Sequence, residues 1–285
     1  MTLPATYLSD LLTLAQQFTT GKGWLPMKTA EQLAGKTGRL AHVVPSARPF
    51  ANMLYAALTA SKEAAQARIR EAPPGKVATR RFAIAARWLV ALIMGDSEQI
   101  APLEHDIYAS KPPTPSAKIL AFEFDASPWG GGGILWRNGQ PAEWWTLRWC
   151  VEDCRLAEPR LELGAPKWQT FWEYLALALS LCVWAEPGVP LAVIGDNTGS
   201  LQLLLDCGGS GGILAISREL AWRRARRNWQ LGAGHLPTEA NKLADALSRL
   251  WAQEPADIPT ELANLIQVQP EPVATFWQAI RPPAC

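Results

Sequence analysis

The sequence predicts an α/β domain built on a mixed β-sheet flanked by helices, with a helical region in front of it. Residues 1–110 carry apolar side chains at helical spacing, and a proline-rich stretch, 111–115, follows them. Beyond that stretch, short β-type segments come first in succession and then alternate with helices. We therefore expect a helical region (1–110), a linker (111–115), an α/β domain (116–252) and an acidic, proline-containing tail (253–285).

Four helices are expected in the first region, because apolar residues recur there three or four positions apart. They cover residues 8–18, 31–41, 50–67 and 79–94. Prolines and glycine separate them, most clearly in the Pro73-Pro74-Gly75 segment. The prolines of 111–115 then favour an extended linker between this region and the next.

The α/β domain is expected to open with three strands that form an antiparallel meander. The strands cover residues 118–125, 134–137 and 143–149. Asn138-Gly139 is a strong signal for a two-residue hairpin between the last two. Four consecutive glycines, 130–133, are interpreted as a turn beside Asp125 that would let a substrate backbone come close.

After an irregular segment, 150–167, helices and strands alternate. The expected helices cover 167–185, 197–206, 213–227 and 238–251, and the strands Pro190–Gly195 and 229–233. Thr238 is expected to cap the last helix. The order β-β-β-α-β-α-α-β-α predicts a sheet of three antiparallel strands continued by parallel ones.

The composition limits the possible functions. Net charge is only +1, but residues 61–87 hold seven basic and two acidic residues, and residues 218–227 five Arg and one Glu. Such clusters suit phosphate backbones. The five cysteines form no Cys-x-x-Cys pair, and the chain has three histidines, which argues against structural zinc. Without a signal peptide or a long apolar run, we expect an intracellular protein, nuclear or cytoplasmic, with reduced thiols and no membrane contact.

Four acidic residues are candidates for chemistry, and each has an ordinary structural alternative. Glu173 is the only charge in a fourteen-residue apolar run, so it is either a metal ligand or an acid satisfied near the helix start. Asp196 follows a strand and could equally cap a helix, while Asp125 could cap a turn. Asp245 could form a surface salt bridge with Arg249, four residues on.

Considered together, the four acids favour a metal site. Carboxylates gathered at one end of a sheet repel each other unless cations neutralise them. Oxygen ligands suit Mg²⁺ or Mn²⁺, and two such ions can clamp the attacking and leaving oxygens of a phosphodiester.

The order Asp, Glu, Asp, Asp on this succession of elements resembles the ribonuclease H family. Phe124-Asp125-Ala126-Ser127 resembles its first-strand motif, Glu173-Tyr-Leu-Ala-Leu its acid-bearing helix, and Gly195-Asp196-Asn197 its strand-end aspartate. The segment 235–249, HLPTEANKLADALSR, resembles the closing signature of this domain in reverse-transcribing retroelements. The resemblance implies an endonuclease that cuts the RNA strand of RNA–DNA hybrids with two Mg²⁺ or Mn²⁺ ions, leaving a 3′-hydroxyl and a 5′-phosphate. Asp125 would contact both ions, and His235 would assist proton transfer or product release.

Segments 33–45 and 48–50 resemble the thumb-to-connection helices before this domain in DIRS-like and related retroelement reverse transcriptases. This resemblance implies the reverse transcriptase portion of a polyprotein as a partner. There are departures from the pattern, since no polymerase Tyr-x-Asp-Asp motif occurs and Thr238 stands where the family has glycine. Glu123 is an unusual fifth acid that should point the same way as Asp125, either as a buried protonated side chain or as an extra contact to the metal.

The basic helix within 213–227 is the expected nucleic-acid contact, because arginines bind phosphates without reading sequence. Trp222 and Trp229 could stack on a sugar or a base, and Trp129, more weakly, could touch the minor groove of a hybrid. The alternative is an ordinary solvated helix face. The residues assigned to nucleic-acid binding are Arg218, Arg223, Arg224, Arg226, Arg227, Trp222 and Asn197.

Two other functions stay open. The chain could be a retroelement remnant that binds nucleic acid without cutting it. It could also be a 3′–5′ exonuclease, although those enzymes carry Asp-x-Glu on the first strand and this chain has Glu123-x-Asp125.

Overall fold

The computed structural model describes residues 3–69, 71–94, 120–157, 161–165, 167–227 and 229–271, except for the side chain of Arg226. The chain divides into two compact units. Unit 1 contains the described residues up to Met94 together with 221–226, and unit 2 contains the other described residues from Leu120 onward. The expected linker, 111–115, lies outside the described residues.

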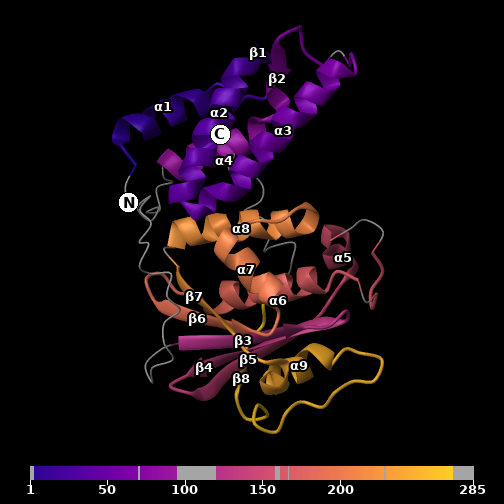
Figure 1. Ribbon diagram of the computed structural model, residues 1–285. Coiled ribbons are helices and arrows are strands. Elements are labelled where there is room, and N and C mark those ends of the chain that lie inside the picture. The colour runs from indigo at the N-terminus through magenta and orange to yellow at the C-terminus, as the bar shows by residue number, and fades with distance from the viewer. Residues whose placement is uncertain are drawn as a thin grey trace. The chain divides into compact units, whose positions relative to one another are not determined.

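Unit 1 is helical, as the apolar spacing predicted (Figure 1). Its helices pack around a core that includes Leu33, Phe50, Leu54, Trp88 and Leu89. The helices are α1 (Ala5–Gln16), α2 (Met27–Val43), α3 (Arg48–Gln66) and α4 (Ala83–Met94), with short 3-10 turns at Pro45–Ala47 and Thr79–Arg81.

A two-stranded antiparallel ribbon in unit 1 was not predicted. Its strands are β1 (Trp24–Pro26) and β2 (Lys76–Ala78), and Leu25 pairs with Val77. Strands of three residues are too short to show an alternating pattern in the sequence.

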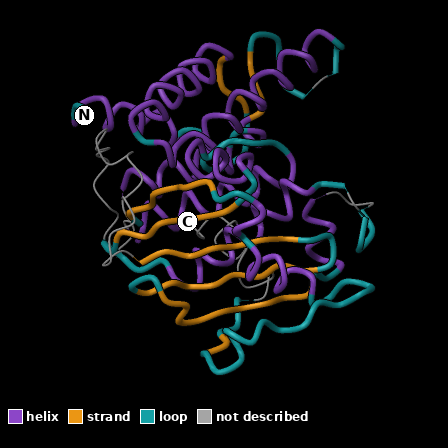
Figure 2. The backbone as a smooth tube through the Cα atoms, turned by 60° about the horizontal axis from the view of Figure 1, so that its bottom comes forward, coloured by secondary structure: helices purple, strands orange, loops and turns teal. Residues whose placement is uncertain are grey.

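Unit 2 is built on a six-stranded mixed sheet, which confirms the predicted fold class. The strand order is β7-β6-β3-β4-β5-β8, and the strands cross Figure 2 as a layer of orange tubes. β3, β4 and β5 are antiparallel, whereas β6 runs parallel to β3 and β7 parallel to β6. The strands are β3 (Leu120–Ala126), β4 (Gly130–Arg137), β5 (Gln140–Arg148), β6 (Pro190–Gly195), β7 (Gln230–His235) and β8 (Ile266–Gln267).

The short strand β8 comes from the segment that the sequence suggested to be an acidic tail. It pairs in parallel with β5, and the Val268 N–H donates to the carbonyl of Trp144 at 2.9 Å. Leu262, just before it, is fully buried. Residues 262–268 therefore pack as part of unit 2.

Helices cover both faces of the sheet (Figure 1). On one face lie α6 (Gln169–Trp184), α7 (Thr198–Asp206) and the first part of α8 (Gly211–Arg227), and on the other lies α9 (Lys242–Arg249). α6 is the central core helix, because its residues from Phe171 to Leu181 are all buried. None of the described helices is by itself long and apolar enough to cross a membrane, and α7 with α8 passes that test only as a pair bent by 52°.

A helix, α5 (Val151–Ala157), lies where the sequence suggested irregular structure. Its start is capped, since the Cys150 N–H donates to the Asp153 carboxylate at 2.8 Å. Glu152 and Asp153 in its first turn also favour a helix start. The segment has only seven residues, too few to establish helical spacing of apolar side chains.

The interpretation of the four glycines as a turn was wrong, because they form the first half of β4. Space explains why no side chain is present. A Cβ on Gly132 would lie 2.4 Å from the Leu247 Cβ in α9, and one on Gly131 would lie 2.6 Å from the Trp149 ring. The lack of side chains at these glycines thus lets α9 and the Trp149 ring pack closely against β4. The turn itself lies at residues 127–129.

The expected capping by Thr238 was also wrong. Thr238 begins a 3-10 turn, Thr238–Ala240, and α9 starts only after Asn241. The Asn241 side chain is fully buried and donates to the carbonyl of Phe124 at 3.1 Å. This bond ties the start of α9 to β3, the strand that carries Asp125.

Candidate metal centre

Three of the four predicted acids meet at one edge of the sheet. Asp125 lies near the end of β3, Glu173 in α6, and Asp196 directly after β6. Each offers one carboxylate oxygen, and the three oxygens lie within 4.8 Å of one another. Parallel pairing explains the convergence of the aspartates: Glu123 is in register with Ile194, and each aspartate stands two residues further on.

Glu173 is the most deeply buried member, with 3% of its surface exposed. Gln169, one helical turn earlier, donates to Oε1 at 2.9 Å and also to the Ala126 carbonyl at 2.5 Å. Oε2 is buried and has no hydrogen-bond partner among the described residues. Burial raises the pKa of Glu173 well above its usual value, and the charge of Asp125 raises it further. The alternative of a satisfied acid therefore accounts for only one of the two oxygens.

Asp125 is also buried, with 6% of its surface exposed. Burial raises the pKa of Asp125 from its usual 3.8 to about 7; Asp245 and Asp196 raise it too, whereas the Ser248 hydrogen bond and the Arg249 charge lower it. The Ser248 hydroxyl donates to Oδ2 at 2.6 Å. Without a cation, this carboxyl group keeps its proton up to about neutral pH.

The structure shows that Asp196 does not cap the helix that follows it. The N-cap of α7 is Asn197, whose Oδ1 accepts from the Ser200 N–H at 2.9 Å. The Asp196 carboxylate is thus left facing Asp125 and Glu173. The predicted contact of Asn197 with nucleic acid would have to coexist with this capping bond.

Asp245 is outside the group of three. Its Oδ1 accepts from Arg249 Nε at 2.7 Å, which is the salt bridge that the spacing suggested. It nevertheless lies close enough for its charge to raise the pKa of Asp125. Asp245 is therefore beside the site, with one oxygen in the salt bridge.

His235 ends β7 at the same edge of the sheet. It is in register with Gly195, the residue before Asp196, and its side chain is exposed. This position leaves the imidazole accessible to solvent and to a substrate.

The basic side chains of α8 are less exposed than expected for a helix that contacts nucleic acid with its surface. Among the arginines of α8 whose side chains the structure describes, Arg218, Arg223 and Arg224 are half-buried and only Arg227 is exposed. Burial lowers the pKa of Arg218. Trp222 is 3% exposed and offers no ring face to solvent in this structure. Trp229 is equally buried, and the side chain of Arg226 lies outside the described part.

Two residues that position the acids were missed by sequence reasoning. Gln169 stands four residues before Glu173, so the helical spacing alone was a usable signal. Ser248 reaches Asp125 across 123 positions of sequence, and no local pattern reveals such a contact. Glu123 is half-buried and outside the group of three, and burial raises its pKa to about 7.

Among solved structures, the chain is similar to RNase H1 from the halophilic archaeon Halobacterium salinarum NRC-1. The match covers 45% of this chain and 92% of that chain, with 20% sequence identity and a TM-score of 0.31. No family model matches the chain, and no curated protein matches it in sequence.

Proposed function

We propose that this chain is a metal-dependent endonuclease of the ribonuclease H type, acting on the RNA strand of RNA–DNA hybrids. The observation that supports it most is the group formed by buried Asp125 and Glu173 with half-buried Asp196, in which one Glu173 oxygen has no partner among the described residues. Burying a carboxylate without a partner is costly, so the site has a strong reason to take up a cation.

The residues present fit Mg²⁺ or Mn²⁺. All three donors are carboxylate oxygens, the ligands that these hard cations prefer, and no described cysteine or histidine belongs to the group. Asp125, Glu173 and Asp196 would hold the metal, with Asp245 nearby. When bound, divalent ions polarise the phosphodiester and stabilise the charge that develops on the attacking and leaving oxygens.

The surrounding side chains orient the acids. Gln169 links Glu173 to the end of β3, and Ser248 holds one oxygen of Asp125 from α9. Each bond leaves the other carboxylate oxygen free to face the centre. His235, exposed at the same edge, is available to move a proton or to help product leave. Selectivity for RNA would come from contacts with 2′-hydroxyl groups.

The resemblance of 33–45, 48–50 and 235–249 to reverse-transcribing retroelements supports a finer proposal, in which the chain derives from such an element and acts beside its reverse transcriptase portion. Co-purification of the chain with that portion, encoded by the same element, would test it. Independent behaviour of the two proteins would contradict it.

Cleavage of an end-labelled RNA–DNA hybrid tests the nuclease activity. We expect cuts within the RNA strand in Mg²⁺ or Mn²⁺ and none in EDTA. Asp125→Asn, Glu173→Gln and Asp196→Asn should each abolish cleavage. Asp257→Asn, which alters an exposed acid of the same unit, should cleave normally.

Each alternative gives a different result. Hybrid binding in EDTA with no turnover in either metal would indicate a binding module. Digestion of a labelled single strand from its 3′ end would indicate an exonuclease. Unchanged cleavage by Asp125→Asn would remove the proposed mechanism.

A further inference from the structure

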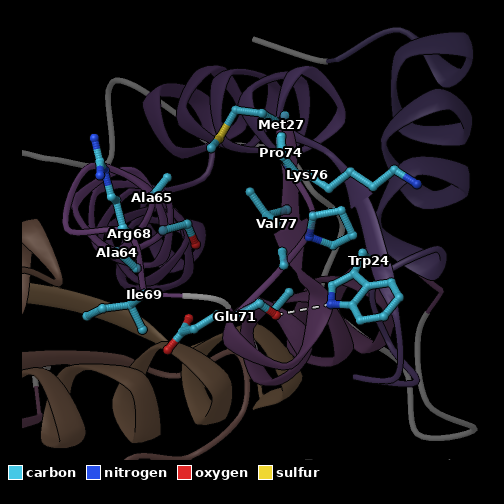
Figure 3. A pocket seen from close by; sticks show the side chains of 15 residues that line it. Trp24, Met27, Ala64, Ala65, Arg68, Ile69, Glu71, Pro74, Lys76 and Val77 are labelled. Atoms are coloured by element: carbon cyan, nitrogen blue, oxygen red, sulfur yellow. Dashed lines mark hydrogen bonds between the residues drawn. The ribbon is translucent and has the colours of Figure 1, made fainter.

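Unit 1 contains a cavity that the proposed nuclease activity does not use. It has a volume of about 820 Å³ and lies between the end of α3, the segment after it, and the β1–β2 ribbon. Its walls are mainly apolar (Figure 3), with Met27, Ala65, Ile69, Pro74 and Val77 among the lining residues. Pockets of this size are in the range that accommodates ligands or partner side chains.

Two large apolar side chains at the cavity are exposed to an unusual degree. Trp24 is 55% exposed and Ile69 58% exposed. The Trp24 indole N–H donates to the Glu71 carbonyl at 3.1 Å, the dashed line in Figure 3, which fixes how the ring lies. Ile69 follows Arg68, whose φ of 57° is in the left-handed region, and its N–H donates to the Ala64 carbonyl at 2.9 Å. Hydrogen bonds with the backbone therefore fix the positions in which Trp24 and Ile69 are exposed at the cavity.

Apart from Arg68 and Lys76, the polar side chains of the wall are already engaged in hydrogen bonds. The Ser61 hydroxyl donates to the Ala57 carbonyl at 2.8 Å, and the Glu71 carboxylate accepts from Arg81 at 2.7 and 2.8 Å. A nucleobase placed in this cavity would find few side-chain partners for its polar edge, and leaving that edge unpaired is costly. The interior consequently suits apolar groups.

The rim, in contrast, is cationic. Arg68 and Lys76 lie on opposite sides of the cavity (Figure 3), and neither forms an ion pair within the part of the chain that the structure describes. Glu71 is the one acid among the described lining residues, and Arg80 and Arg81 neutralise it. Two cations on opposite sides suit a ligand whose anionic groups are separated by an apolar stretch, rather than an amphiphile with a single charged end.

We propose that this cavity docks a segment of a partner protein that inserts apolar side chains flanked by aspartate or glutamate. The apolar part would fill the cavity between Ile69, Val77 and Trp24, and the acids would pair with Arg68 and Lys76. This is the arrangement of peptide recognition in which apolar anchors enter a groove and charges at the rim set the orientation.

Selection of a random peptide library displayed on phage against the full-length chain tests the chemistry of the partner without assuming it. Enriched peptides should carry apolar residues flanked by acids. A synthetic copy should bind the chain saturably, and Ala65→Trp should abolish its binding. Ala65 is exposed, so the added ring fills the cavity without entering the core.

Reversal of the charges of Arg68 and Lys76 tests whether these cations pair with the acids of the peptide. The double variant Arg68→Glu, Lys76→Glu should weaken peptide binding roughly tenfold or more, because rim charges contribute to orientation and affinity. Lys167→Glu, which reverses an exposed charge in unit 2, should leave binding unchanged. Thermal melts of each variant confirm that it is folded.

Other outcomes would overturn the proposal. Enrichment of peptides without acids, or of no peptide at all, would be one such result, and equal binding by the Ala65→Trp variant another. Displacement of the peptide by a short single-stranded oligonucleotide would instead assign the cavity to nucleic acid. Peptide binding requires no cleavage, so this result stands apart from the success or failure of the nuclease assay.

Discussion

The metal-free protein should become more stable when Asp125 is replaced by Asn. Asp125 is buried beside two other carboxylates, and burial raises its pKa from 3.8 to about 7. The unfolded chain therefore releases this proton near pH 4, whereas the folded protein retains it until about pH 7. Between these pH values the folded state binds more protons, so its stability falls as pH rises.

The magnitude follows from the two pKa values. One pKa unit corresponds to about 1.4 kcal/mol, so the interval from 3.8 to about 7 corresponds to about 4 kcal/mol lost above neutral pH. An Asn side chain is uncharged but retains an oxygen that can accept from Ser248. In EDTA at pH 8, Asp125→Asn should thus gain up to about 4 kcal/mol, and near pH 4 the gain should vanish.

Urea unfolding at a series of pH values, with and without Mg²⁺, measures this effect. Mg²⁺ should stabilise the wild-type protein by binding its folded state, and it should stabilise Asp125→Asn much less. Asp257→Asn should follow the wild-type curve. If Asp125→Asn is less stable than the wild type in EDTA at pH 8, the prediction is wrong, because the carboxylate would then stabilise the fold by itself.

Three further outcomes follow from individual contacts. Gly132→Ala should destabilise unit 2 by about 2 kcal/mol or more, because the new Cβ would lie 2.4 Å from the Leu247 Cβ. Urea unfolding measures this effect, and unchanged stability would mean that α9 is less closely packed on β4. Ser248→Ala should raise the Asp125 pKa above about 7, because a hydrogen bond that lowers this pKa is lost. A ¹³C carboxyl NMR titration without metal measures the pKa, and an unchanged value would argue against the bond. Arg68→Gly should be more stable than Arg68→Ala by about 1 kcal/mol, because φ is 57° at this position and glycine adopts that conformation without steric cost. Thermal melts measure the difference, and equal stabilities would contradict the left-handed backbone.

The sequence predicted those parts of the site that depend on local pattern. Glu173 stood out as the one charge in an apolar helix, and Asp196 followed a strand that local apolarity marked clearly. Their meeting with Asp125 agrees with the expectation that the acids gather at one end of a mixed sheet, although the adjacency of β3 and β6 was not predicted.

What the sequence could not predict depends on contacts between distant segments. The Ser248 bond to Asp125 and the pairing of β8 with β5 join residues more than a hundred positions apart. The glycines of β4 are equally compatible with a turn or with close helix packing, and only Leu247 and Trp149 decide between the two. Burial of Trp222 is likewise a tertiary property that its helical spacing did not reveal.

We propose that Asp125, Glu173 and Asp196 together bind a divalent cation. Titration of the whole chain with Mn²⁺, followed by electron paramagnetic resonance of the free ion, measures this binding. We expect saturable binding that competes with Mg²⁺, is lost in Glu173→Gln, and is unchanged in Asp257→Asn. Equal Mn²⁺ binding by the wild type and Glu173→Gln would contradict the claim.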